Sequence, residues 1–239
     1  MCLLPARPAL RPERLTSAAW ARPPEPPRPG RPRVWLARVE DLRGALAPFA
    51  GTLDSGERAR AAALRRAADR DGYRVAHVGL RLLLGAYLGV EPSDVTFVRR
   101  PCPVCRGPHG RPDVPGVPLC FSVSRTDGLC LLAFADTPVG ADIERLPGSD
   151  VVAALTDTLH PREAAELAAC PPQGRPAAFA RVWTRKEAYL KGLGTGLGRD
   201  LRSDHLGASA RGPRRMPGWT VDDVAVGRDH SAAVAVAER

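Results

Sequence analysis

Asp142 and Glu144 are the first residues whose type and spacing could do chemistry, and they flank Ile143 in an apolar segment. Successive side chains of a strand point to opposite faces, so both carboxylates would share one face and Ile143 would point to the core. Two carboxylates at close range do not both stay ionised unless a cation lies between them. The pair could therefore hold a metal ion. A pair with this spacing is also common on exposed strands, so the segment alone leaves both interpretations open.

A second set of residues follows the period of a helix. Trp183, Glu187 and Lys191 are spaced by four, which places them on one face of a helix. One interpretation is structural: a buried tryptophan beside a Glu–Lys pair that contributes about 0.2–0.5 kcal/mol. The other is chemical: Glu187 would be a third carboxylate opposite Asp142 and Glu144, and together they would form an all-oxygen site of the kind that suits Mg²⁺.

The scarcity of lysine favours the chemical interpretation. Of the 35 basic residues only Lys186 and Lys191 are lysines, and the chain has no asparagine. This bias is typical of a GC-rich genome in which arginine replaces lysine wherever only the charge matters. Arginine keeps its proton in a protein, whereas lysine can release it. Both remaining lysines lie in residues 183–192, so this segment is indicated as functional.

Composition and charge narrow the classes of function. The net charge of +9 indicates an anionic partner: a nucleic acid, a phosphorylated cofactor or an acidic protein. Aromatic residues make up only 5%, which argues against a nucleic-acid-binding surface, and we expect no nucleic acid partner. No apolar run reaches the ~18 residues of a membrane span, and residues 1–32 lack the apolar stretch of a signal peptide. We therefore expect a cytoplasmic protein with free thiols and no membrane partner.

The predicted elements follow one order twice. A strand near residues 34–37 precedes helices over about 55–88 and strands at 119–123, 129–135 and 139–144; helices follow from about 161 and over 175–191, then strands near 218–226 and 230–237. This order predicts an α/β (α+β) fold of two similar lobes with pseudo-twofold symmetry, at residues 33–137 and 138–239. Residues 1–32 hold nine prolines and six arginines and are predicted to be a disordered tail.

Four segments together resemble a known family. Residues 121–125 (Phe-Ser-Val-Ser-Arg), 139–144 (Val-Gly-Ala-Asp-Ile-Glu) and 183–192 (Trp-Thr-Arg-Lys-Glu-Ala-Tyr-Leu-Lys-Gly), with Gly-Arg-Pro at 110–112, are similar to the motifs of the Sfp-type 4'-phosphopantetheinyl transferases. The resemblance covers about residues 33–239, and the third segment is highly specific. Two positions depart from the family pattern, because Ser122 and Arg125 stand where asparagine and histidine are common.

The resemblance implies two lobes with coenzyme A in the cleft between them. The implied reaction moves 4'-phosphopantetheine from coenzyme A to a serine of an apo acyl or peptidyl carrier protein. Asp142, Glu144 and Glu187 would hold Mg²⁺, Glu187 or a water held by it would act as the base, and Lys191 would assist the leaving phosphate. The serine belongs to the partner, so no Ser–His pair is needed, and a monomer suffices. The carrier could serve fatty-acid, polyketide or nonribosomal-peptide synthesis.

The same resemblance places several residues on coenzyme A. Arg125 keeps a fixed positive charge where a histidine would carry it only partly at pH 7, so a phosphate contact survives the departure from the pattern. The residues implied to contact phosphate or adenine-side groups are Arg111, Ser124, Arg125 and Lys191, with Arg58, Arg66 and Arg74 as further candidates.

Two alternatives stay open. Another metal-dependent phosphoryl-transfer enzyme, such as a nuclease or phosphatase, could use the same carboxylates, and it would hydrolyse its substrate without an acceptor protein. Separately, Cys102-x-x-Cys105 with His109 four residues later has spacing that suits zinc, with Cys120 as a candidate fourth ligand. We expect free thiols there instead.

Overall fold

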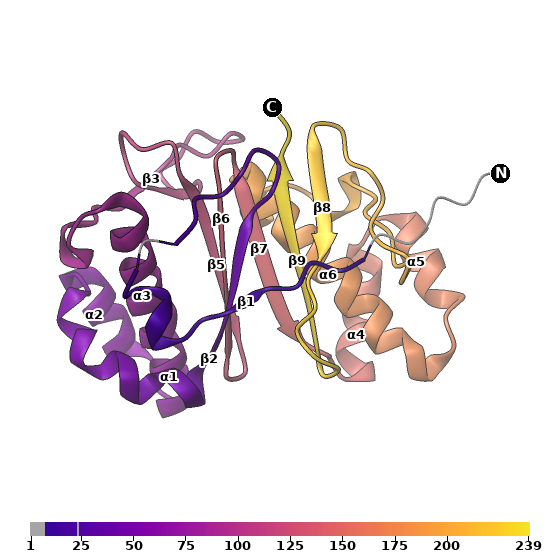
Figure 1. Cartoon of the computed structure of the whole chain (residues 1–239). Coiled ribbons are helices and arrows are strands. Elements are labelled where there is room, and N and C mark those ends of the chain that lie inside the picture. The colour runs from indigo at the N-terminus through magenta and orange to yellow at the C-terminus, as the bar shows by residue number, and fades with distance from the viewer. Residues whose placement is uncertain (1–7, 23) are drawn as a thin grey trace.

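The computed structural model describes residues 8–22 and 24–239 (Figure 1). The strands and helices expected from the sequence are present, whereas the short strands at 13–14, 98–99 and 112–113 and the helices at 39–46 and 149–155 were not predicted. The strands are β1 Glu13–Arg14, β2 Arg33–Arg38, β3 Val98–Arg99, β4 Pro112–Asp113, β5 Cys120–Thr126, β6 Leu129–Ala135, β7 Val139–Arg145, β8 Trp219–Asp223 and β9 His230–Ala237. The α-helices are α1 Val39–Leu46, α2 Ser55–Ala63, α3 Ala67–Leu88, α4 Ser149–Leu155, α5 Pro161–Ala168 and α6 Arg175–Leu193. The predicted α/β class is confirmed; the pseudo-twofold symmetry and the lobe boundaries stay predictions.

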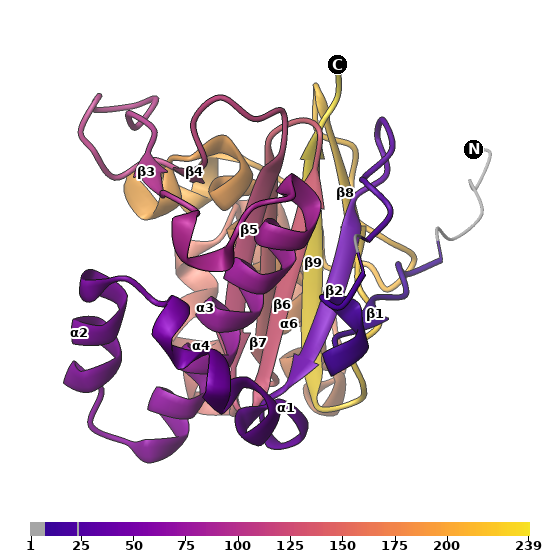
Figure 2. The ribbon, with the colours of Figure 1, turned by 60° about the vertical axis from the view of Figure 1, so that its left-hand side comes forward.

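Two main sheets lie between two groups of helices. The first has the strand order β1-β2-β6-β5 and the second β7-β9-β8. Figures 1 and 2 show β5 and β7 side by side, with α1–α3 and α4–α6 on opposite sides of the strands. The Ala141 backbone N–H on β7 donates to Ser122 Oγ on β5 at 3.0 Å. The edges of the two sheets therefore meet at these two strands.

Both faces of β6 are buried, which explains why its sequence is apolar without alternation. Leu131 packs with Ile143 and Val234 of the second sheet, whereas Leu132 and Phe134 belong to the core beneath α1 and α3. On the far side, α6 packs against β8 and β9. Because both faces of this strand are covered, a polar side chain on either face would be buried, so the sequence is a continuous apolar run.

Helix α6 approaches β7 closely because two glycines face each other. A Cβ on Gly140 would lie 1.9 Å from the Ala188 carbonyl oxygen and 2.3 Å from the Gly192 nitrogen, so no side chain fits at this position. The helix ends at Gly194, whose φ of 82° is the left-handed conformation that glycine adopts freely. The close packing brings residues 142 and 144 of β7 opposite the last two turns of α6.

The prediction of a disordered N-terminal tail is wrong for residues 8–22 and 24–32. Strand β1 pairs in parallel with β2, and Leu15 is buried in the first core. The Leu10 N–H donates to the Asp223 carbonyl at 2.8 Å, so the segment reaches from the first sheet to the second. The prediction rested on the Pro/Arg-rich composition, but two leucines and a free strand edge suffice to hold the segment. Residues 1–7 and 23 of the predicted tail lie outside the described residues.

A membrane span would need a long, uninterrupted apolar helix, and the helices of the described residues include none.

Candidate active site

A cleft of about 980 Å³ opens where β5 and β7 meet, and α3 and α6 line its two sides. Seven of the ten residues expected to act in catalysis, metal binding or coenzyme A binding line it: Arg111, Ser124, Arg125, Asp142, Glu144, Glu187 and Lys191. They come from β5, β7, α6 and the loop after β3, so the fold brings together segments that are up to 80 residues apart in the chain.

Asp142 lies at the base of this cleft and has one oxygen without a partner. Its Oδ1 accepts hydrogen bonds from Ser124 Oγ at 2.8 Å and from Lys191 Nζ at 2.5 Å. Its Oδ2 is buried and has no hydrogen-bond partner within residues 8–22 and 24–239. A buried acceptor left unpaired costs about 1–3 kcal/mol. This oxygen is therefore free to bind a cation.

Glu144 and Glu187 carry more negative charge than the site can balance. The pKa of Glu144 is raised to about 7, first by burial and then by the charge of Asp142, while Lys191 opposes the shift. Burial also raises the pKa of Glu187; Lys191 opposes that shift, and Asp142 adds to it. One ammonium does not neutralise three carboxylates. A divalent cation with a preference for oxygen ligands would, so the residues present fit the expected magnesium ion.

Lys191 forms its ion pair with Asp142, whereas the structural interpretation of the helix spacing had expected Glu187. Its side chain is 32% exposed, so the ammonium touches both the buried aspartate and the open cleft. Ser124 Oγ is 3.2 Å from the same Nζ. This arrangement favours a role in the cleft over a surface helix pair.

The arginines divide into those that face the cleft and those that do not. Arg111 lines it and donates to the Gly192 carbonyl at 3.1 Å. The guanidinium of Arg125 lies 5.7 Å from the centre of the Tyr73 ring, which also lines the cleft. The structure does not bring Arg58, Arg66 or Arg74 into the cleft: all three are exposed elsewhere, and Arg58 donates to the Leu53 carbonyl.

Sequence reasoning missed two basic residues of the cleft, Arg99 and His77, and covered Arg60 only as part of the arginine cluster over residues 58–66. Arg60 follows Arg58 by two positions, which is about 200° around a helix, so the two side chains face different ways. His77 stacks on Tyr73 with ring centres 3.9 Å apart and its Nδ1 lies 3.1 Å from Glu57 Oε1. In a chain with arginines throughout, composition gave no signal for which of them would face the cleft.

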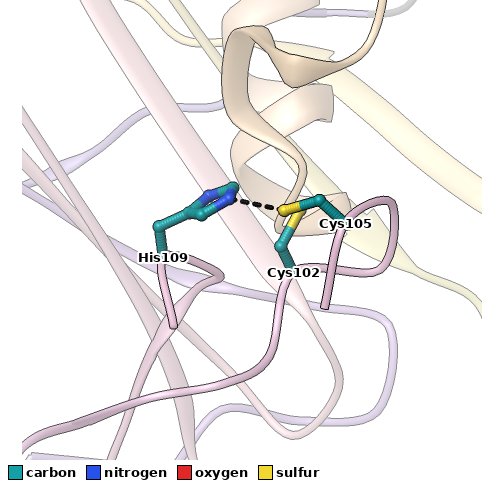
Figure 3. Close-up of side chains that lie close together, drawn as sticks. All are labelled: Cys102, Cys105 and His109. Atoms are coloured by element: carbon teal, nitrogen blue, oxygen red, sulfur yellow. Dashed lines mark hydrogen bonds between the residues drawn. The ribbon is translucent and has the colours of Figure 1, made fainter. Parts of the chain in front are cut away.

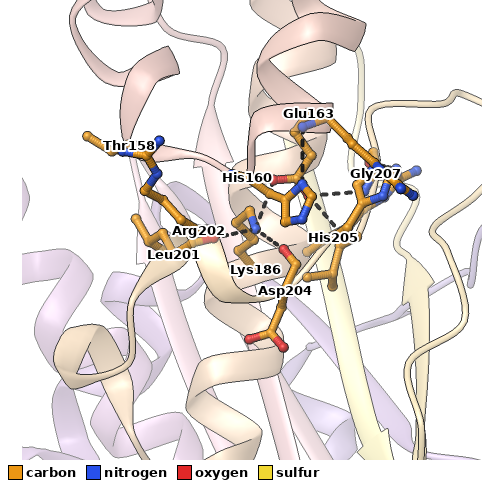
Figure 4. Close-up of polar contacts among 12 residues, drawn as sticks. Thr158, His160, Glu163, Lys186, Leu201, Arg202, Asp204, His205 and Gly207 are labelled. Carbon is orange, nitrogen blue, oxygen red and sulfur yellow. Dashed lines mark hydrogen bonds and ion pairs between the residues drawn. The ribbon is translucent and has the colours of Figure 1, made fainter.

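The other lysine has a different environment. Lys186 is 2% exposed, and its Nζ lies 2.8 Å from Glu163 Oε2 and 2.7 Å from the Leu201 carbonyl; it also donates to the Asp204 carbonyl (Figure 4). The ammonium is enclosed by these oxygens, and Lys186 is not among the residues that line the cleft. Lys186 is therefore a structural residue, and the narrow lysine head fits where a guanidinium would not.

Comparisons with known proteins point to one family. The family model described as 4'-phosphopantetheinyl transferase superfamily matches residues 138–233, which include the carboxylates and α6. The 4'-phosphopantetheinyl transferase HetI of Nostoc sp. is 31% identical over 211 residues, covering 85% of this chain and 86% of that protein. A putative 4'-phosphopantetheinyl transferase of Synechocystis sp. is 25% identical over 70% of this chain and 66% of that protein. The 4'-phosphopantetheinyl transferase of Bacillus subtilis is 28% identical over 48% of each chain.

Proposed function

Because the chain belongs to the 4'-phosphopantetheinyl transferase superfamily and is an enzyme of that class, we propose that it uses Mg²⁺ to move phosphopantetheine from coenzyme A to a serine of an apo acyl or peptidyl carrier protein. The observation that supports the metal requirement most is the unpaired, buried Oδ2 of Asp142. It lies in a cleft with two further carboxylates whose pKa values are raised.

Asp142, Glu144 and Glu187 would hold the magnesium ion. When bound there, Mg²⁺ supplies neutralisation of the negative charge on the pyrophosphate oxygens of coenzyme A. Phosphoryl transfer depends on positioning and charge balance more than on covalent help from the protein. Asp142 is paired with Lys191, and this single ammonium does not also neutralise Glu144 and Glu187, so the site suits charge balance by a metal ion.

Glu187 would take the proton of the carrier serine, directly or through a water. Burial raises its pKa toward the operating pH, which makes it a better proton acceptor than an exposed glutamate. The Lys191 ammonium donates a hydrogen bond to Asp142 and is also exposed to the cleft. From there it would donate a hydrogen bond, or a proton, to the leaving phosphate.

The arginines of the cleft would hold coenzyme A. A volume of about 980 Å³ is at the upper end of the ~300–1,000 Å³ of ligand pockets, which suits a long cofactor. Four arginines line it (Arg60, Arg99, Arg111 and Arg125), and arginine forks match phosphate oxygens. The hydrolytic alternative would use the same carboxylates, but the family and the relatives favour transfer. Cytoplasmic location and a monomeric state stay predictions from the sequence.

The test is mass spectrometry of apo carrier proteins of the fatty-acid, polyketide and peptide classes after incubation with coenzyme A, Mg²⁺ and the enzyme. At least one carrier should gain one phosphopantetheine, and Asp142→Ala should abolish the gain. Asp127→Ala is the matched control, because Asp127 is exposed on a turn and pairs with Arg145. Release of free phosphopantetheine without any modified carrier would support the hydrolytic alternative instead.

A further inference from the structure

The loop between β3 and β4 brings together three side chains that the proposed transfer does not use. The ligand atoms of Cys102, Cys105 and His109 all lie within 4.8 Å of one another, and Cys105 Sγ is 2.8 Å from His109 Nε2 (Figure 3). We propose that these three residues form a zinc site, separate from the magnesium site, with a water as the fourth ligand. This replaces the free thiols expected from the sequence.

The backbone of the loop is folded around the two sulfurs. The Cys102 N–H donates to the Gly107 carbonyl and the Arg106 N–H to the Cys102 carbonyl, each at 2.8 Å. The Gly107 N–H donates to Cys105 Sγ at 3.4 Å. A Cβ on Gly107 would lie 3.1 Å from the His109 ring and 3.3 Å from Cys105 Sγ, so the turn leaves little room for any side chain there.

The backbone conformation of Arg106 also indicates that its surroundings impose the shape of this turn. Its φ of 64° makes it the one non-glycine residue in the left-handed region among residues 8–22 and 24–239. Such a conformation costs about 1–3 kcal/mol and persists only where the surroundings impose it.

The distances suit zinc after a small adjustment. With Zn–S of about 2.3 Å and Zn–N of about 2.0–2.1 Å, a tetrahedral site needs an S···N separation of about 3.6 Å. Cys105 Sγ and His109 Nε2 are at 2.8 Å, so they need to separate by less than about 1 Å. Cys120, the fourth ligand considered from the sequence, is not part of the cluster. Cys105 and His109 are exposed, so a water can complete the tetrahedron.

The site would hold in place a loop that reaches the cleft. His109 itself lines the cleft, and Arg111 follows two residues later. The Arg100 N–H donates to the Arg111 carbonyl at 2.9 Å, which ties the two ends of the loop together. Zinc would therefore fix the position of Arg111. This consequence rests on the proposed function, whereas the metal site itself does not.

The experiment measures metal binding directly. The protein is stripped with a chelator, titrated with Zn²⁺ in competition with a chromophoric chelator, and separately titrated with Co²⁺ while the thiolate-to-cobalt charge-transfer band is recorded. Wild type should bind one Zn²⁺ per chain and show that band. Cys105→Ser and His109→Ala should each weaken zinc binding by at least about tenfold, since each removes a ligand. Cys170→Ser is the matched control, because this half-buried thiol lies on the turn after α5.

Two further readouts distinguish the outcomes. Hydrogen exchange in residues 100–111 should slow when Zn²⁺ is added to wild type and stay unchanged in Cys105→Ser. Less than a tenth of an equivalent of zinc bound by wild type at micromolar free Zn²⁺ would overturn the proposal. Equal loss of binding in Cys170→Ser would overturn it too, because it would show that zinc binds cysteines unspecifically. A failed carrier assay with intact zinc binding would count against the proposed function alone.

Discussion

Lys186→Met removes the ammonium from a buried ion pair and keeps an unbranched side chain of similar length. In the wild type, Lys186 Nζ lies 2.8 Å from Glu163 Oε2, and the exposed fractions of the two side chains are 2% and 0%. In the variant, Glu163 keeps hydrogen bonds from the backbone N–H groups of Leu206 at 2.7 Å, Gly207 at 3.1 Å and His160 at 3.2 Å. It loses its only counter-charge among the ion pairs of the described residues.

The magnitude follows from these contacts. Removing one partner of a buried pair costs about 3–5 kcal/mol, because a buried charge remains uncompensated. Since the backbone donors to Glu163 remain, we expect the lower end of that range, about 3 kcal/mol. For a domain of this size each 1 kcal/mol lowers Tm by about 2–4 °C, so Lys186→Met should melt about 6–12 °C below wild type.

Thermal and urea unfolding of four proteins test this prediction: wild type, Lys186→Met, Glu163→Gln and the double variant. The double variant should lose clearly less stability than the sum of the single losses, since each single variant leaves a buried charge without its counter-charge. Arg162→Met on the exposed face of α5 is the matched control and should stay within about 0.5 kcal/mol of wild type. A melting point for Lys186→Met within 2 °C of wild type, or additive losses in the double variant, would refute the reasoning.

Three further predictions concern the cleft. Lys191→Arg should have nearly the wild-type melting temperature and affinity for coenzyme A, but it should lose about 10²-fold or more in single-turnover transfer. The reason is that the wider guanidinium does not fit beside Asp142 and keeps its proton. Full activity of the variant would contradict the assignment. Burial raises the pKa of Glu144 to about 7, so the folded protein holds a proton between about pH 4.5 and 7 that the unfolded chain has released, and stability falls as pH rises through that window. A cation must displace that proton, so Mg²⁺ affinity by calorimetry should weaken by up to about tenfold per pH unit below 7. Glu144→Gln should flatten that slope, and the remaining slope would come from Glu187, whose pKa burial also raises. Arg125→Ala should lose roughly 10- to 100-fold of the preference for coenzyme A over 3'-dephospho-coenzyme A; an unchanged preference would assign the contact to another arginine.

The periodicity of residue types along the sequence predicted the main helices and strands and which candidate site residues share a face. Alternation along residues 139–144 placed Asp142 and Glu144 on one face of a strand, and the spacing by four placed Glu187 and Lys191 on one face of a helix. Both patterns depend only on the geometry of a single element, which the chain carries in its own order of residues. The fold class followed from the same periods.

The arginines show what the sequence pattern did not predict, namely which of them line the cleft. Arg58 and Arg60 belong to one helix and have the same chemistry, yet only Arg60 lines the cleft. Which face of α2 turns to the cleft depends on how the helix packs, and no local pattern records it. The N-terminal segment is a similar case, because Leu15 becomes a core residue only when β2 offers its edge to β1.

The two lysines give the clearest division between sequence and structure. Residue usage alone marked Lys186 and Lys191 as positions where arginine does not serve. The tertiary structure decided why: the first ammonium is enclosed against Glu163, and the second meets Asp142 at an open cleft. Residues five positions apart point about 140° away from each other around a helix, so one ammonium of α6 faces an enclosed group of oxygens and the other faces the open cleft beside β7.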